Sequence, residues 1–146
     1  MAQVLRGALW LYPLVNLAHV LGIVLLFGAV TISDLRLMGL WRVIPLAALT
    51  GPTIPVAVAG FGLAATSGAA LVSVKATKYS ANPFLYAKFG GVAFAGANAA
   101  ALHASSAWRT RHRDSDASHG RFWVAGSVSL ACWLASVAAG RMIAYW

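Results

Sequence analysis

Apolar residues gather in four long blocks along this chain, and short polar stretches separate the blocks. The blocks cover about residues 8–32, 54–74, 84–107 and 122–143. Each holds 21 to 25 residues, and about 20 residues of α-helix cross a hydrocarbon core roughly 30 Å thick. Because backbone N–H and C=O groups find no partners in lipid, helices are the expected spanning elements. The pattern predicts an all-α, integral membrane four-helix bundle that forms a single transmembrane domain over residues 1–146.

The first polar stretch, residues 33–53, mixes leucine, methionine and tryptophan with Arg36 and Arg42 and contains Pro45 and Pro52. It is too apolar for a free loop and too interrupted for a membrane span. Segments of this kind lie in the plane of the membrane interface, with aromatic residues such as Trp41 at the level of the lipid headgroups. We therefore expect an interfacial segment between the first and second helices.

Composition supports a membrane location. The apolar residues make up 60% of the chain and the charged residues 10%, whereas soluble domains carry about 25% charged residues. The net charge of +8 is a feature of nucleic-acid-binding proteins as well. Here the basic residues lie in or near the polar gaps, where they contact lipid headgroups and set membrane orientation. The lipid bilayer, and no nucleic acid, is the expected partner.

An even number of spans places both chain ends on one side of the membrane, which we call the terminal side; the other is the loop side. The terminal side carries five basic residues, namely Arg6, Lys75, Lys78, Lys88 and Arg141. The loop side carries six, namely Arg36, Arg42, Arg109, Arg111, Arg113 and Arg121. The sequence WRTRHR concentrates this charge in one short loop, so the positive-inside rule predicts a cytoplasmic loop side and external termini.

Small residues recur at helical spacing in the later blocks. Gly60, Ala64 and Gly68 follow one another every four residues, and Gly91 and Ala95 begin a similar series in the third block. Helices in lipid approach closely where small residues face each other. These series predict a compact bundle.

His19 lies almost at the middle of the first block, and Tyr12 and Asn16 share its helix face. Polar residues within membrane spans commonly mark functional sites. The alternative is that His19 donates to a backbone carbonyl or serine of a neighbouring helix and fixes helix packing. The sequence leaves both readings open.

The first functional reading is a b-type haem, which imidazoles on facing helices can ligate. His19 is the first expected ligand and His103 the second, while Lys88 and Arg141 would neutralise haem propionates or a quinone headgroup. His103 lies about seven residues past the centre of its span, roughly 10 Å away at 1.5 Å per residue. His19 is near the centre of its own span. Two separate sites, or one site with His19 and another partner, therefore remain alternatives.

The second reading is a metal site or solute path. Cys132, at the middle of the fourth block, could join His19 as a soft ligand for copper, and Asn98 could line the path. A single buried cysteine also serves as a small apolar residue, and Asn98 could equally bond to another helix. The spans hold neither a carboxylate pair nor a nucleophile with its base, so a redox subunit is expected before any stand-alone enzyme.

The stretches AHVLG, DLRLMG, NPFLYAKFG and AGRMIAYW together resemble an uncharacterised family of small bacterial four-helix inner-membrane proteins. This resemblance covers most of the chain and implies a multi-pass protein of the bacterial inner membrane, with periplasmic N- and C-termini. More distantly, Lys88 and Asn98 in a helix rich in alanine and glycine look like part of the copper-resistance D (CopD) type membrane proteins. Those proteins are associated with copper passage across the inner membrane.

Three functions follow as expectations. The first is a cofactor-carrying or electron-transfer subunit with haem b, and the second is copper or small-solute passage. The third is a structural anchor that docks another membrane or periplasmic protein, or a second copy of the chain, through its Gly and Ala faces. The substrate and the electron partner stay open at this stage.

Overall fold

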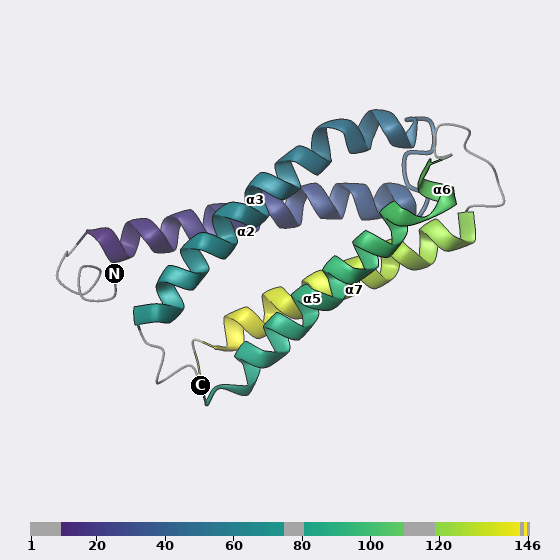
Figure 1. Cartoon of the computed structure of the whole chain (residues 1–146). Helices are drawn as coiled ribbons and strands as arrows, with labels where there is room; N and C mark the ends of the chain where they lie inside the picture. Colours follow the sequence, from purple (N-terminus) through teal and green to yellow (C-terminus); the bar gives the residue numbers. More distant parts are fainter. Residues whose placement is uncertain (1–9, 75–80, 110–118, 144, 146) are drawn as a thin grey trace.

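The computed structural model describes residues 10–74, 81–109, 119–143 and 145. These residues form four long helices and one short helix (Figure 1). The helices are α2 (Leu11–Leu37), α3 (Leu46–Val74), α5 (Pro83–Ala104), α6 (Ser106–Arg109) and α7 (His119–Met142). No strand occurs in these described ranges. The predicted all-α four-helix bundle is confirmed.

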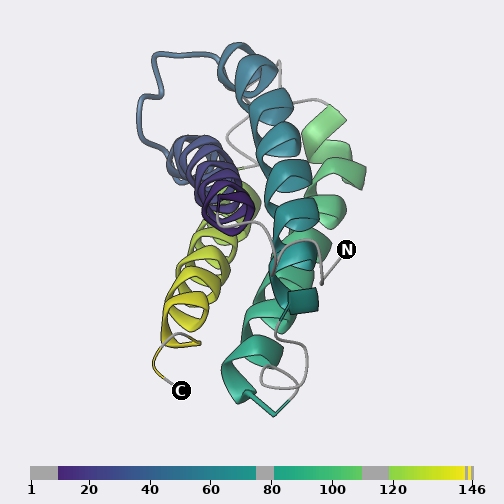
Figure 2. The ribbon, with the colours of Figure 1, turned by 90° about the vertical axis from the view of Figure 1, so that its left-hand side faces the viewer.

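The bundle consists of two antiparallel helix pairs. Helix α2 packs on α3, and α5 packs on α7, while α2 and α7 join the two pairs. Helices α3 and α5 hardly touch each other, although they follow one another in the sequence. Figure 2 shows α2 and α7 on one side of the bundle and α3 and α5 on the other. The backbones of the two pairs therefore approach each other along one side only, while Leu37, Leu46 and Trp108 form one buried cluster near the loop-side end.

Three of the helices, α2, α3 and the Gly120–Met142 part of α7, are long and apolar enough to cross a membrane. Helix α5 has 22 residues and is about 33 Å long. Its polar residues Lys88, Asn98 and His103 reduce its apolar character. Because α5 lies along α7 (Figure 1), we treat it as the fourth helix that crosses the same layer.

The first helix is longer than predicted. We expected it to end near Ile32, but α2 continues to Leu37 and so contains Asp34 and Arg36. Both side chains are buried. Arg36 donates from Nε to the Ile44 carbonyl at 2.7 Å. Because both side chains are buried within the protein and do not face lipid, helix α2 continues past these two charged residues.

The predicted interfacial segment, residues 33–53, is correspondingly reduced to a link over residues 38–45. Helix α3 begins at Leu46, not near Ile54, and passes through Pro52 and Pro55. Prolines are tolerated in membrane helices where other groups compensate for the lost backbone bonds. Threonine hydroxyls at positions 50 and 53 donate to carbonyls of the first turns of α3.

The other boundaries differ from the expected ones by a few residues. Helix α5 begins at Pro83, where the Asn82 side chain accepts a hydrogen bond from the Phe84 N–H at 2.9 Å. It ends at Ala104, not near residue 107, because Ser105 adopts an extended conformation. Helix α7 starts at His119, three residues before the predicted start.

The predicted series of small residues forms the contact between α2 and α3. A Cβ atom on Gly60 would lie 2.5 Å from the Leu26 backbone nitrogen, and one on Gly22 would lie 2.6 Å from the Ala64 nitrogen. The two backbones are therefore in direct contact. No larger side chain fits at either glycine without separating the helices.

This contact generates a prediction with a matched control on the same helix. We expect Gly60→Leu to lower the free energy of unfolding by about 1–3 kcal/mol, because it overpacks the interface. Gly62→Leu should have little effect, because a Cβ atom on Gly62 meets nothing within 4 Å. Thermal melting of the purified protein in detergent measures both, and equal losses for the two variants would contradict the assigned packing.

Candidate functional site

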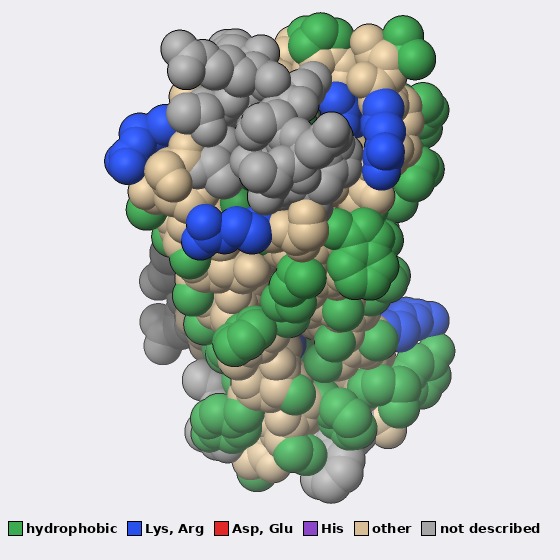
Figure 3. Space-filling model, turned by 90° about the vertical axis from the view of Figure 1, so that its right-hand side faces the viewer, with side chains coloured by type: hydrophobic (Ala, Val, Ile, Leu, Met, Phe, Trp, Pro, Cys, Tyr) green, Lys and Arg blue, Asp and Glu red, His purple; other side chains and the backbone are tan. Residues whose placement is uncertain are grey.

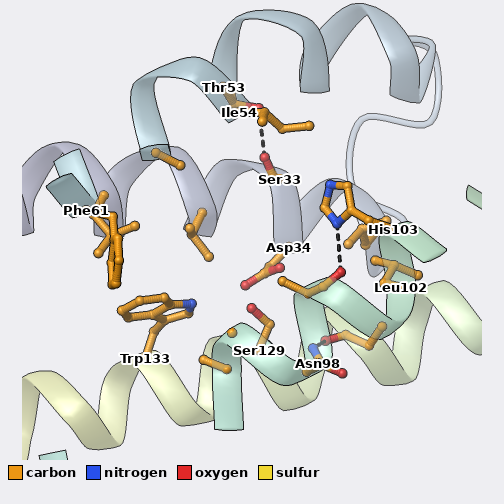
Figure 4. A pocket seen from close by; sticks show the side chains of 18 of the residues that line it. Ser33, Asp34, Thr53, Ile54, Phe61, Asn98, Leu102, His103, Ser129 and Trp133 are labelled. Carbon is orange, nitrogen blue, oxygen red and sulfur yellow. Dashed lines mark hydrogen bonds between the residues drawn. The ribbon is translucent and has the colours of Figure 1, made fainter. Parts of the chain in front are cut away.

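A cavity of about 540 Å³ lies between the two helix pairs, in the half of the bundle nearer the loop side (Figure 4). Its walls come from the second half of α2, the first half of α3, the second half of α5 and the first half of α7. The Ser33 and Thr53 hydroxyls lie 2.8 Å apart across α2 and α3 at its edge. The cavity has the size of a small-molecule pocket, which is about 300–1,000 Å³, and its surface is mostly apolar.

Asp34 is the charged residue of this cavity. Its side chain is only 4% exposed, and Figure 4 shows the carboxyl group pointing toward Ser129 on α7. The Ser129 hydroxyl lies close enough to interact with the carboxyl group. The carboxyl oxygen Oδ2 has no hydrogen-bond partner among the described residues. Asp34 is thus a buried acid with at least one unpaired oxygen.

The close contact between α2 and α7 explains this position. A Cβ atom on Gly126 would lie 2.8 Å from the Asp34 backbone oxygen, so the two helices touch at this level. Ser129 lies one turn further along α7, which brings its hydroxyl to the carboxyl group. The sequence GSVS in α7 therefore supplies both the space for α2 and the partner for Asp34.

An ionised carboxylate in apolar surroundings is unfavourable unless it is paired. Arg36 is two residues away on α2 and so projects from a different face; it donates to the carbonyls of Ile44 and Arg42. Thr31 and Ser127 also have buried hydroxyl oxygens without a hydrogen-bond partner, but hydroxyls are neutral. The Asp34 carboxyl group therefore needs either a proton or a bound cation.

His103 lies on the wall of the same cavity. Its Nδ1 atom lies 2.7 Å from the Ala99 carbonyl oxygen, and because a carbonyl only accepts, Nδ1 carries the proton. Its ring centroid lies 4.2 Å from that of Trp108. A neutral imidazole held in this way has an unprotonated Nε2 atom, which is the atom that binds metals.

His19 lies elsewhere, between α2 and α3. Its Nδ1 atom donates to the Ala64 carbonyl at 2.8 Å and lies 3.3 Å from the Ser67 hydroxyl. Its ring covers Gly68, where a Cβ atom would lie 2.9 Å from Cε1. These are the contacts of the packing reading, a carbonyl and a serine of a neighbouring helix. The cavity that His103 lines does not include His19, so the two predicted haem ligands do not share it.

The predicted propionate or quinone partners lie nearer the terminal side. The Lys88 Nζ atom would lie 3.5 Å from a Cβ atom on Gly140 of α7. Arg141 is exposed and donates to the Tyr145 hydroxyl at 2.8 Å. The structure therefore directs Lys88 toward α7 and Arg141 along its own helix.

The residues predicted for a copper site or path are His19, Cys132 and Asn98. Asn98 donates to the Ala125 carbonyl at 2.9 Å, which confirms the reading in which it bonds to another helix. Cys132 is half-buried. Within the described ranges, no group of three His, Cys, Asp or Glu side chains could hold a metal ion. Asn16, which was predicted to share a helix face with His19, is exposed.

Sequence reasoning missed Asp34 and its partner Ser129. The motif SDLR resembles the end of a span, since a charge normally marks the membrane boundary. A signal was present in the apolar residues that follow, because Leu35 and Leu37 continue the helical pattern beyond Asp34. A helix that continues past an acidic residue implies that the acid faces protein and not lipid.

Comparison with models of known protein families, with curated proteins and with solved structures found no match for this chain. Its function is therefore inferred from the geometry and chemistry of the cavity. The resemblances found in its sequence remain predictions.

Proposed function

We propose that this chain is a small membrane protein that binds a lipid-soluble small molecule in the cavity between its two helix pairs. It differs from the predicted passage of copper or a small solute past His19, because the ligand here binds in the cavity that Asp34 lines. The observation that supports it is the cavity itself, which combines a volume of about 540 Å³ and apolar walls with a few polar groups. Sites for small molecules have this composition.

The side from which the cavity is reached supports a lipid-soluble ligand. Both α3 and α5 contribute to its walls, yet the two helices hardly touch. Val58 and Phe61 of α3 are 66% and 47% exposed, and in a membrane that exposure is to lipid. A ligand dissolved in the bilayer could therefore reach the cavity between α3 and α5 without passing through water.

The membrane orientation remains part of this proposal. Figure 3 shows basic side chains around the loop-side end of the molecule. The described basic residues there are Arg36, Arg42, Arg109 and Arg121. By the positive-inside rule this end is cytoplasmic, so the cavity lies in the cytoplasmic half and the termini are periplasmic. The assignment to the bacterial inner membrane rests on the sequence resemblance.

A b-type haem is the second candidate for the same cavity, and one observation favours it. The Nδ1–H group of His103 donates to the Ala99 carbonyl, which orients the ring and leaves Nε2 available as an axial ligand. His103 then replaces His19 as the first expected ligand, because His103 lines the cavity. His103 would hold the haem iron, and the surrounding apolar walls would exclude water.

The absorption spectrum of protein purified from haem-replete cells tests this candidate. If haem binds, we expect a Soret band that His103→Ala removes and His19→Ala retains, because only His103 lies on the cavity wall. A band that depends on His19 would restore the original assignment. A colourless preparation would remove haem from the candidates.

Two glycines of α5 offer a direct test of the binding proposal. Neither Gly96 nor Gly90 has an atom within 4 Å of an added Cβ, but only Gly96 lines the cavity. We expect Gly96→Phe to fill the cavity and to weaken binding of the neutral fluorescent probe N-phenyl-1-naphthylamine at least about tenfold, roughly 1.4 kcal/mol. Gly90→Phe should bind like the unmodified protein.

Fluorescence titration of the purified protein in detergent measures both affinities. The detergent alone and heat-unfolded protein provide the background. Equal affinities in the two variants would show that the probe binds outside the cavity and would contradict the proposal.

A further inference from the structure

We infer that the ligand of this cavity is a lipid-soluble organic cation, whose positive charge pairs with the Asp34 carboxylate. The inference rests on the proposed function, since it requires a cavity that binds a lipid-soluble molecule. It goes further by naming the chemical class of that molecule and the atom that recognises it.

The carboxyl group supplies the first argument. Asp34 is 4% exposed, and its Oδ2 atom has no hydrogen-bond partner among the described residues. Its polar neighbour Ser129 is neutral. A carboxylate beside a neutral group in apolar surroundings has a strong preference for a positive charge. The cavity therefore selects a cation over a neutral molecule or an anion.

The other groups around Asp34 leave this place open to a ligand. Helix α3 contributes the hydroxyls of Thr50 and Thr53, and α7 contributes that of Ser129. Helix α5 contributes the Asn98 amide, which is bonded to α7, and the His103 imidazole. The basic residues nearest in the fold use other partners or face outward: Arg36 bonds to carbonyls of the link, and Arg109 of α6 is exposed.

The aromatic walls favour an organic cation over a metal ion. Phe61 of α3 and Trp133 of α7 lie on the same side of Asp34 in Figure 4. Aromatic faces attract organic cations through the negative potential of the ring face. A sodium, calcium or magnesium ion would instead need about six oxygen ligands, whereas most of this cavity surface is carbon. An alkylammonium or arylphosphonium ion matches both the charge and the walls.

The depth of Asp34 suits such a ligand. Asp34 lies ten residues from the middle of α2, which is about 15 Å along the helix axis. The hydrocarbon core is roughly 30 Å thick, so the carboxyl group lies near its edge. An amphipathic cation dissolved in the membrane concentrates at this level, with its charge toward the headgroups and its apolar part in the core.

Binding of the cation is coupled to release of a proton. Without ligand, the buried carboxyl group is stabilised by a proton, which the arriving cation must replace. The exchange moves one positive charge in and one out, and no bond other than the O–H bond is broken. Cation affinity should therefore fall as the pH is lowered, by up to about tenfold per pH unit.

The test uses the full-length protein in detergent and tetraphenylphosphonium, a permanent lipid-soluble cation, in equilibrium dialysis. We expect saturable binding to the unmodified protein. The isosteric substitution Asp34→Asn should weaken tetraphenylphosphonium binding at least tenfold relative to binding of N-phenyl-1-naphthylamine, and should remove its pH dependence. Asp34→Glu keeps the negative charge, so it should retain both the binding of tetraphenylphosphonium and the pH dependence of that binding.

Two controls separate the causes. Thermal melting shows whether each variant is folded. If Asp34→Asn does not fold, the expected cation binding and pH dependence of Asp34→Glu still test the inference. His103 also lies on the cavity wall, so His103→Ala tests whether it causes the pH dependence. We expect this variant to retain the pH dependence, because Asp34 is its source. If neither the neutral probe nor tetraphenylphosphonium binds to the unmodified protein, the proposed function fails. If the neutral probe binds but Asp34→Asn leaves tetraphenylphosphonium binding unchanged, the cavity is real and the assignment of a cation is wrong.

Discussion

The structure depends on one constraint: polar groups inside a membrane must find partners within the protein, because lipid offers none. His19 satisfies it through the Ala64 carbonyl, and Asn98 through the Ala125 carbonyl. Each of these bonds joins one helix to its pair partner. The Asp34 carboxyl group does not fully satisfy it, because its Oδ2 atom has no hydrogen-bond partner in the described ranges. We propose that this exception marks the functional site.

The same constraint connects the fold with the cavity. Backbone contact at Gly22 and Gly60 holds α2 against α3, and contact at Gly126 holds α2 against α7. No comparable contact joins α3 to α5, so the two helix pairs separate on that side and leave the cavity between them. Packing through small residues thus determines where the bundle is tight and where it is open.

The sequence predicted the four helices because the length and apolar character of each block are sufficient to indicate a membrane span. It misplaced the ends of α2 and α3, because a charge or a proline looks the same whether it faces lipid or protein. The direction of Asp34 depends on Ser129, far along the chain, and no local pattern reveals that contact.

The polar residues at depth show the same limit. Two readings of His19 were open in the sequence, and the Ala64 carbonyl with Ser67 on α3 supplied the contacts of the packing reading. The alternative for Asn98, a bond to another helix, could be stated but its partner could not. His103 was predicted as a haem ligand, and that role stays a prediction; its position on a cavity wall depends on the arrangement of all four helices.

The most direct test of the account is the accessibility of position 34 to water. In a Cys132→Ser background, Asp34→Cys and Val43→Cys would each introduce a single thiol, and a membrane-impermeant maleimide would report its exposure in intact membranes opened to both sides. The account predicts rapid labelling of the variant at position 43, where the native side chain is 97% exposed, and little labelling of the variant at position 34. Equal labelling rates at the two positions would place Asp34 in a water-exposed loop and contradict the account.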